Sequence, residues 1–351
     1  MISKKNALIF VMVLIVISIV SLNLVYDKAD KSKNATKTSV KIGVTIYNQY
    51  DTFISSLVNY LTEYAKYKER DEGITITLDI SNAGGNQLTQ NYQVENYIRE
   101  GYDIICINLV DRTDASVAID MAINADIPII FFNRELVEKD LQRWNKLFYV
   151  GAVALESGIM QGQIVVDYCE KNFDKVDKNK DGILQYVILE GEPGHQDALI
   201  RTECVINTII ESGIAVEKVG DEIANWTRAQ AETKMSQWLK NDVGKEIEIV
   251  IANNDDMALG AIDAIKKEEI VDYPIVVGID GTKVGLEAVK NGDMIGTVYN
   301  DAKGQAEGIV ELAYSLAFGE PLPENIELID GKYIRKPHII ITPDNVEQYM
   351  D

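Results

Sequence analysis

Residues 40–53 read VKIGVTIYNQYDTF, and this stretch contains the repeating unit of the fold. Its first seven residues are mostly apolar and rich in β-branched side chains, which predicts a buried β-strand over 40–46. Polar and aromatic residues follow directly, and a helical pattern then covers residues 53–67. The unit is therefore a strand, a polar turn and a helix.

The same alternation continues along the chain. Further strands are predicted at 74–80, 103–107, 127–132, 184–189, 247–252, 275–279 and 294–298, and further helices at 113–124, 228–239, 257–268 and 302–318. Strands that alternate with long helices form parallel sheets from βαβ units, which predicts an α/β fold. These elements exceed one comfortable sheet, so we expect two α/β domains.

Polar residues follow most of the predicted strands. Open α/β sheets bind ligands beyond the carboxyl ends of their strands, so these residues are candidates for one site. They lie at 47–53, 133–135, 192–197, 253–255, 280 and 300–301, with Arg201 one helical turn further on and Trp226 before a helix. No Gly-rich phosphate loop or basic cluster accompanies them, which argues against a nucleotide ligand.

This mixture suits a neutral polyol. A sugar hydroxyl both donates and accepts hydrogen bonds, so it pairs with carboxylates or amides and with Arg or Asn donors. Phe53 and Trp226 offer flat surfaces for the apolar face of a pyranose ring. Taken singly, each Asp or Asn after a strand could instead be a helix N-cap, Phe53 a core residue and His195 a surface residue. Their recurrence at one edge of the sheets favours the binding site.

Residues 177–185 read DKNKDGILQ and resemble the first part of an EF-hand calcium loop. Oxygen side chains occupy positions 1, 3, 5 and 9, and glycine occupies position 6. Position 12, where a bidentate Glu is expected, is Ile188, and the following segment is predicted as a strand. The loop is either a solvated turn or a calcium site that is completed by a distant carboxylate.

Composition limits the classes of partner. The 351-residue chain has a formal net charge of −21, which argues against nucleic acid and anionic membrane surfaces. Three scattered cysteines predict neither a disulfide framework nor a zinc site, and Cys106 is expected in the core.

The N-terminus predicts a targeting element. Lys4 and Lys5 precede a stretch from 7 to 26 that is uncharged and long enough to span a bilayer. We favour an uncleaved anchor over residues 1–26, with a cleaved signal as the alternative. Residues 27–39 are then a flexible tether, and the rest of the chain lies outside the cytoplasm.

From residue 40 onward the chain resembles the periplasmic D-galactose/D-glucose-binding proteins of sugar ABC transporters, members of the type 1 periplasmic binding protein family. The resemblance rests on ordered strings: IGVTIY at 42–47, INLVD at 107–111, FFN at 131–133, EPGH at 192–195, IANND at 251–255 and GTV at 296–298. Tyr50 and Thr52 depart from the residues that are usual around Asp51 in this family. The resemblance implies two Rossmann-like lobes, a three-strand hinge and a ligand between the lobes.

The resemblance also selects ten of these residues as the sugar site: Asp51, Phe53, Asn133, His195, Asp197, Arg201, Trp226, Asn254, Asp280 and Asn300. Phe53 and Trp226 would sandwich a hexose ring, and the other eight candidates would hydrogen-bond its oxygens. One structural calcium ion would be held by Asp177, Asn179, Asp181, the carbonyl of Ile183, Gln185 and, from a distant strand, Glu248.

The lobes implied by the resemblance are 40–151 with 303–335, and 152–300 with 338–351. Closure of these lobes around D-galactose or D-glucose would present the sugar to an ABC permease, with the protein acting as a monomer. A membrane-tethered sensor that presents the sugar to a chemoreceptor or sensor kinase is the alternative. A sugar-processing enzyme using Asp51, Asp197 or Asp280 is the rival class, but nothing in the sequence selects an acid and a nucleophile.

Overall fold

The computed structural model describes residues 37–269 and 273–350. The predicted membrane segment at 1–26 lies outside the described residues, as does the tether up to residue 36. Among the helices of the described residues, none is long and apolar enough to cross a membrane. Residues 40–351 form one compact unit, which contains two separate parallel sheets.

The first sheet is parallel along the pairs that join β1 to β3, β3 to β4, β4 to β5 and β5 to β11. Its strand order is β11-β5-β4-β3-β1-β2. The strands are β1 (Ser39–Ile46), β2 (Thr75–Asn82), β3 (Ile104–Ile107), β4 (Ile129–Phe132), β5 (Leu147–Gly151) and β11 (Tyr333–Arg335).

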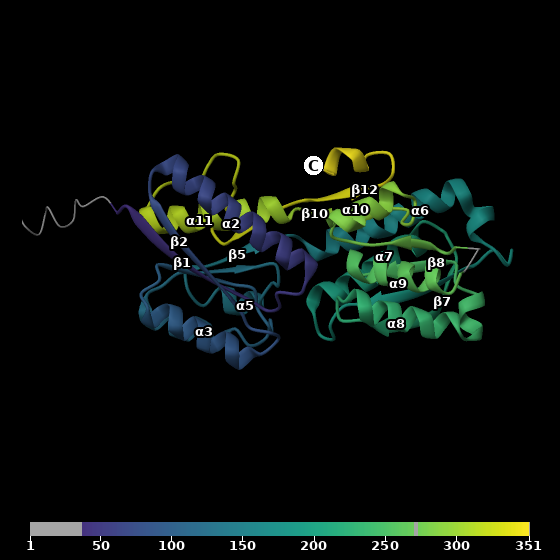
Figure 1. The fold of residues 1–351 in the computed structure, drawn as a ribbon, viewed down its shortest axis with the longest axis horizontal. Helices are drawn as coiled ribbons and strands as arrows, with labels where there is room; N and C mark the ends of the chain where they lie inside the picture. Colours follow the sequence, from purple (N-terminus) through teal and green to yellow (C-terminus); the bar gives the residue numbers. More distant parts are fainter. Residues whose placement is uncertain (1–36, 270–272, 351) are drawn as a thin grey trace, which may run out of the picture. The chain divides into compact units, whose positions relative to one another are not determined.

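Helices cover both faces of this sheet, and we call the whole the N-terminal lobe (Figure 1). One face packs on α2 (Thr52–Glu72) and α11 (Ala302–Phe318). The other face packs on α3 (Gln87–Arg99), α4 (Ser116–Ala125) and α5 (Glu138–Leu141).

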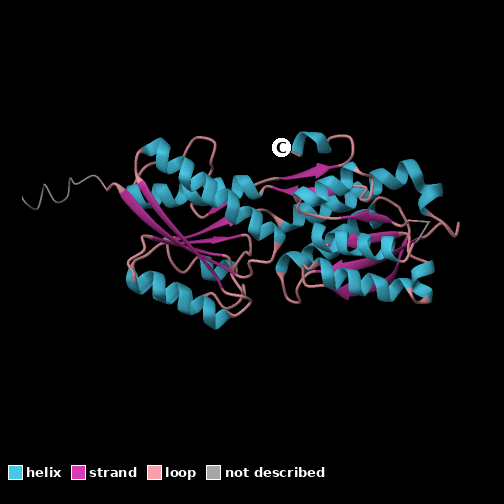
Figure 2. Cartoon of the chain, viewed as in Figure 1, coloured by secondary structure: helices cyan, strands magenta, loops and turns pink. Residues whose placement is uncertain are grey.

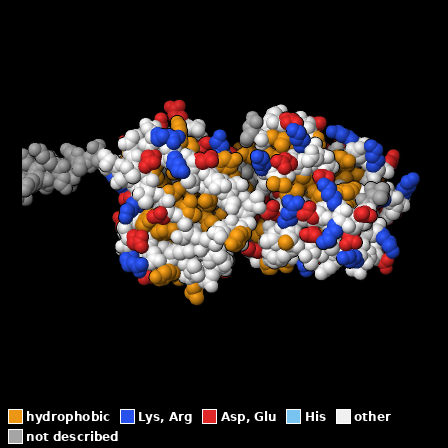
Figure 3. All heavy atoms as spheres, in the orientation of Figure 1, with side chains coloured by type: hydrophobic (Ala, Val, Ile, Leu, Met, Phe, Trp, Pro, Cys, Tyr) orange, Lys and Arg blue, Asp and Glu red, His pale blue; other side chains and the backbone are white. Residues whose placement is uncertain are grey.

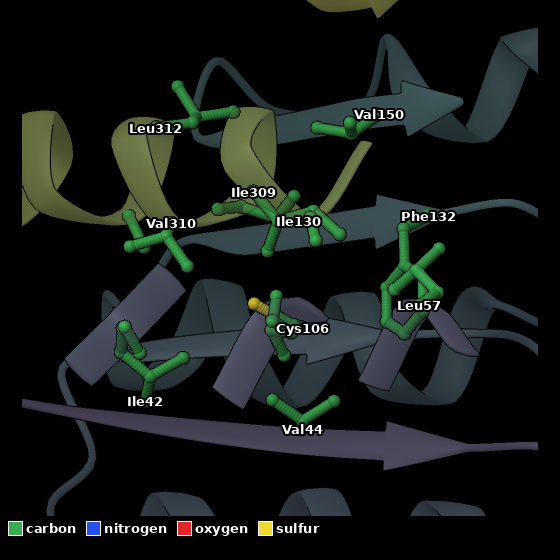
Figure 4. Packing of buried hydrophobic residues seen from close by; sticks show 14 of the residues in the cluster. Ile42, Val44, Leu57, Cys106, Ile130, Phe132, Val150, Ile309, Val310 and Leu312 are labelled. Carbon is green, nitrogen blue, oxygen red and sulfur yellow. The ribbon is translucent and has the colours of Figure 1, made fainter. Parts of the chain in front are cut away.

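Alternating side chains of each strand point to opposite faces, so every central strand contributes to both cores. In Figure 4, Ile42 and Val44 of β1 lie near Cys106 of β3, below Ile130 of β4. Cys106 is fully buried in this cluster, which confirms its predicted place in the core. All three cysteines of the chain are free.

The second sheet has the order β7-β6-β8-β9 and is parallel throughout. A short antiparallel pair of strands, β10 and β12, accompanies it through isolated bridges at Gly296 and Tyr299. The strands are β6 (Leu184–Glu190), β7 (Val216–Ile223), β8 (Ile249–Ala252), β9 (Ile275–Val277), β10 (Thr297–Asn300) and β12 (His338–Ile341). The strand over 184–190 confirms that the loop before it is not part of a helix–loop–helix unit.

Five helices enclose the second sheet, and we call this the C-terminal lobe (Figure 2). The α6 and α7 helices contribute to one core, and α8, α9 and α10 contribute to the other. The bounds are α6 (Ala154–Val176), α7 (Gln196–Glu211), α8 (Arg228–Leu239), α9 (Asp255–Lys267) and α10 (Lys283–Lys290), with short 3-10 helices at Asp242–Lys245 and Val346–Tyr349. The α/β fold with two parallel sheets confirms the fold predicted from the sequence.

The chain passes between the two sheets after β5, after β10 and between β11 and β12. Arg335 at the third passage binds Glu135 through two hydrogen bonds, at 2.6 and 2.8 Å, and donates to the carbonyl of Ala152 at 3.0 Å. The first and third passages are thus joined by one guanidinium group.

Charged side chains of both signs are interspersed on the face drawn in Figure 3. In this view the acidic groups do not gather into one continuous surface, although the net charge of the whole chain is −21.

Candidate functional site

A small polar cavity lies where strand ends of both sheets meet. Its lining residues are Asp51, Phe53, Asn133, Arg134, His195, Asp197, Arg201, Trp226, Asn254 and Asp280. The structure therefore brings together every sequence-predicted ligand-binding residue except Asn300. Asn300 is buried at the end of β10, where its Oδ1 accepts a hydrogen bond from Gln305 at 2.7 Å.

Three of these residues are also helix N-caps. Asp51 accepts from the amide of Ile54 at 2.9 Å and begins α2, and Asn254 accepts from the amide of Met257 at 3.0 Å and begins α9. His195 begins α7 through its Nδ1. The capping interpretation and the cavity placement are both right, because the N-termini of helices that follow parallel strands lie at the ligand-binding edge.

Arg201 is a fixed guanidinium group in the cavity wall. It is buried, and it donates to Ser157 Oγ at 3.1 Å and to the carbonyl of Asn253 at 3.0 Å. Its Nη2 atom lies 3.6 Å from Asp197 Oδ2. The cavity thus presents a cation and a carboxylate one helical turn apart, which suits a hydroxyl group that donates to one and accepts from the other.

Burial lowers the pKa of His195 to about 3, so the imidazole is neutral. Its Nδ1 accepts from the amide of Asp197 at 3.1 Å, so the ring proton lies on Nε2 and this atom is a donor. The His195 ring packs edge-on against Trp226, with centroids 5.0 Å apart. The helix cap therefore selects the tautomer that the cavity uses.

The backbone at the cavity wall adopts left-handed conformations without glycine. Asn133 has φ 59°, and the consecutive Asn225 and Trp226 have φ 48° and 64°. Such strain clusters at functional sites because surrounding contacts hold it in place. The indole of Trp226 packs against Gly191, where a Cβ atom would lie only 2.0 Å from the ring, so a residue without a side chain is required.

Two buried carboxyl groups lie beside one another at this edge of the C-terminal lobe. Asp280 lines the cavity with φ 122°, and burial raises its pKa well above the usual range. Asp255 is fully buried, accepts from Thr297 Oγ1 at 2.6 Å and from the amide of Thr282 at 2.7 Å, and has a pKa raised to about 7 by burial.

The raised pKa of Asp255 predicts a pH-dependent stability. The folded protein holds this proton at pH values where the unfolded chain, with an Asp pKa of about 4, has released it. Stability is therefore fullest below pH about 4, falls as the pH rises toward 7, and is level above that. We expect the melting temperature of the wild type to fall over this range relative to Asp255→Asn, which keeps an acceptor but cannot ionise. A constant difference between the two proteins from pH 4 to pH 8 would contradict the assignment.

Arg134 lines the cavity although the resemblance does not select it. Sequence reasoning placed it directly after a strand, next to Asn133. The guanidinium carbon lies 3.4 Å from the ring centroid of Tyr47, and Nη1 donates to the carbonyl of Val110 at 3.1 Å. A second cavity of about 380 Å³ adjoins the first and shares Arg134, His195 and Asp197 with it.

No residue of the loop at 177–185 lines either cavity, and the loop lies at the start of β6, the end opposite the cavities. Its backbone turns at Lys180 and Gly182, which have φ 62° and 81°. Asp177 accepts from the amides of residues 181 and 182 at 3.2 and 3.0 Å. Asp181 accepts from the amide of Ile183 at 2.8 Å, which is the main cause that lowers its pKa.

Glu248 closes this loop from the strand edge. Its two carboxylate oxygens accept from the amides of Lys178 at 2.6 Å and Gln185 at 3.0 Å, so one side chain spans both ends of the loop. The amide groups of Asn179 and Gln185 donate to Asp181 Oδ2 at 3.0 and 3.1 Å. Across residues 37–269 and 273–350, no three His, Cys, Asp or Glu side chains converge as a metal-binding group.

Comparison with known proteins places the chain in a family. The sequence pattern of the periplasmic binding protein domain matches residues 42–321. The D-galactose/methyl-galactoside binding periplasmic protein of Haemophilus influenzae is 35% identical over 312 residues, which cover 88% of this chain and 92% of that protein. A putative rhizopine-binding protein of Rhizobium meliloti is 31% identical, with 88% and 92% covered.

A solved structure resembles the chain as well. The ABC transporter solute binding protein of Bacillus halodurans, crystallised with bound myo-inositol, is 32% identical and superposes with a TM-score of 0.75. The match covers 90% of this chain and 99% of that one.

Proposed function

The chain belongs to the periplasmic binding protein family, and from this premise we propose that it binds D-galactose or D-glucose outside the cytoplasm for an ABC permease. It is a binding protein of the sugar-transport type and not an enzyme, as the family and the relatives above are. The observation that carries the proposal is the polar cavity, which gathers two aromatic residues with carboxylates, amides, two Arg and one neutral His.

We assign a role to each group from its chemistry. Phe53 and Trp226 would contact the apolar faces of the sugar ring. Arg201 and the Nε2 of His195 would donate to sugar oxygens, and Asp51 and Asp197 would accept from its hydroxyl groups. A site with buried polar groups rejects a ligand that leaves them unpaired, so the stereochemistry at each hydroxyl would determine affinity.

Membership of the family supports the permease partner, and the apolar stretch at 7–26 of the sequence supports the anchored location. A relative that binds D-galactose supports a hexose, while the relatives named for rhizopine and myo-inositol support cyclic polyols in general. Lobe closure around the sugar would give the permease a signal that distinguishes loaded from empty protein.

A thermal-shift panel tests the choice of ligand. Binding to the native state raises the melting temperature by mass action, so D-galactose or D-glucose should raise it at millimolar concentration. D-Mannitol serves as the control, because it has the hydroxyl groups but no ring. If myo-inositol stabilised the protein and neither hexose did, the ligand class would stand and the hexose assignment would fall.

We propose separately that the loop at 177–185 holds one structural calcium ion. Carboxylate, amide and carbonyl oxygens are the donors that calcium takes, and they come here from Asp177, Asn179, Asp181, Ile183, Gln185 and Glu248. Glu248 spans the two ends of the loop, so the donor set fits the ion in kind. In this structure the three carboxylates accept backbone amides and do not converge, so binding would turn them toward one ion. The ion would hold α6 and the start of β6 to β8, which stabilises the C-terminal lobe.

Calcium removal is therefore expected to lower the melting temperature without abolishing sugar binding. The measurement compares 1 mM calcium with excess chelator in the wild type and in Glu248→Gln. The wild type should show a calcium-dependent difference and Glu248→Gln should show little. An equal chelator effect in both proteins would show that Glu248 is not a ligand.

A further inference from the structure

Arg134 is a buried cation that has two contacts within its own lobe, the N-terminal lobe. It is 4% exposed, although its guanidinium group always carries a positive charge. Tyr47 stacks on it at 3.4 Å, and the carbonyl of Val110 accepts from Nη1 at 3.1 Å. Both partners belong to the same lobe as Arg134, so these two contacts do not depend on the other lobe.

A second Arg134 nitrogen reaches the other lobe. Nη2 lies 2.9 Å from Glu192 Oε2, and Glu192 directly follows the strand β6 of the C-terminal lobe after one glycine. Both residues line the second cavity, and Arg134 lines the first cavity too. The ion pair therefore joins the lobes at the border of the candidate ligand site.

The energetics favour closure. An exposed ion pair contributes little, because both partners lose hydration and side-chain freedom when they meet. Here the ring of Tyr47 and the carbonyl of Val110 already orient Arg134, so that pairing with Glu192 costs it less side-chain freedom. Glu192 is one-third exposed, so it keeps part of its hydration when the pair forms. Pairing with a preorganised cation in a partly buried setting is worth more than a surface pair.

We propose that Arg134 and Glu192 form an interlobe clasp that sets how long the lobes stay closed on their ligand. The inference rests on the proposed sugar-binding function, and it makes both side chains positioning residues whose pairing need not touch the sugar. Breaking the clasp removes an interaction of the closed form alone, so it changes the closed population and the release rate.

A second contact also joins the two lobes. Thr52 Oγ1 donates to Asp256 Oδ2 at 2.5 Å, from the first turn of α2 to the first turn of α9. This hydrogen bond is neutral on one side, so it would not respond to salt as an ion pair does. Salt dependence therefore separates the clasp from the other interlobe contact.

Stopped-flow kinetics with D-galactose test the clasp through Glu192→Gln, which keeps size and hydrogen bonding but removes the charge. We expect the dissociation rate to rise about tenfold, which corresponds to about 1.4 kcal/mol, with the association rate changed less than twofold. Glu222→Gln is the matched control, because Glu222 pairs with Lys234 within the C-terminal lobe at 2.7 Å. Its dissociation rate should equal that of the wild type.

A double-mutant cycle separates the clasp from a merely structural effect. In an Arg134→Gln background the Glu192→Gln change should have almost no further effect on dissociation, and wild-type dissociation alone should speed up in 1 M salt. Additive effects of the two changes, or equal salt dependence in all variants, would overturn the clasp.

A second measurement does not depend on the sugar. Spin labels at the exposed Tyr92 of α3 and Ile210 of α7 report the distance between the lobes in the full chain. Glu192→Gln should shift the distribution toward longer distances, and identical distributions would overturn the clasp. If no hexose bound but this shift occurred, the proposed sugar would fail while the clasp stood.

Discussion

Replacing Asp197 with alanine is expected to weaken D-galactose binding about 100-fold. The change removes an acceptor from the cavity and leaves Arg201 without the carboxylate that lies 3.6 Å from it. Hydrogen bonds that involve charged groups are worth up to about 3 kcal/mol, and each 1.4 kcal/mol is a tenfold change in affinity. Calorimetric titration of wild type and variant measures the difference directly.

The structure offers a matched control for this variant. Asp263 also pairs with an arginine of the C-terminal lobe, Arg228, at 2.5 Å, but it does not line the cavity. Asp263→Ala should therefore bind the sugar as the wild type does. Equal affinity for Asp197→Ala and the wild type would remove Asp197 from the ligand site.

The second large effect concerns stability and lies far from the cavity. Lys68 of α2 is 7% exposed, and its Nζ lies 3.0 Å from Glu311 of α11 and 2.8 Å from Glu72. Tyr64 Oη donates to Glu311 at 2.7 Å. Lys68→Met would leave the buried carboxylate of Glu311 without its cation, which costs about 3 kcal/mol or more.

Urea unfolding measures this cost as a lower transition midpoint for Lys68→Met. Lys66→Met is the control, because Lys66 is exposed on the same helix and should leave the midpoint unchanged. Lys68→Met combined with Glu311→Gln should recover part of the loss, since it removes the unpaired charge. An unchanged midpoint for Lys68→Met would show that the network contributes nothing to stability.

The class of fold and most cavity residues were predictable because they follow one rule. A buried parallel strand reads as an apolar run, and the residues after it lie at the ligand-binding edge. Asp51, His195 and Asn254 could thus be placed without coordinates. Whether such a residue is a cap or a ligand was not decidable from its type, and the structure makes all three of them caps that face the cavity.

Four strands were not predicted. The strand β7 lies at the edge of its sheet, and most of its residues are half-buried or exposed, so it lacks an apolar run. The strands β11 and β12 are only partly buried and lie on either side of Lys336 and Pro337, so neither gives a long apolar run. The strand β5 is fully buried and apolar apart from its last residue, Gly151, and its apolar run was overlooked. The strand β11 pairs with β5 and β12 pairs with β10, and the chain crosses between the lobes next to each of these pairs. Contacts between residues far apart in sequence, such as Arg335 with Glu135, hold these crossings.

Arg134 and Glu192 illustrate what spacing cannot reveal. They are about 60 residues apart, and each follows a strand in a different sheet. Their contact exists only when the two lobes come together, so no local pattern encodes it. The contact of Glu248 with the loop at 177–185 is similar, because Glu248 precedes β8 and the loop leads into the neighbouring strand β6.

Calorimetric titration of the purified protein with D-galactose and D-glucose tests the central claim most directly. The account predicts saturable binding of at least one hexose, with one site per chain and an affinity that Asp197→Ala reduces about 100-fold while Asp263→Ala does not. Absence of heat and of saturation with both hexoses at millimolar concentration would contradict the claim that the cavity between the two sheets is a hexose site.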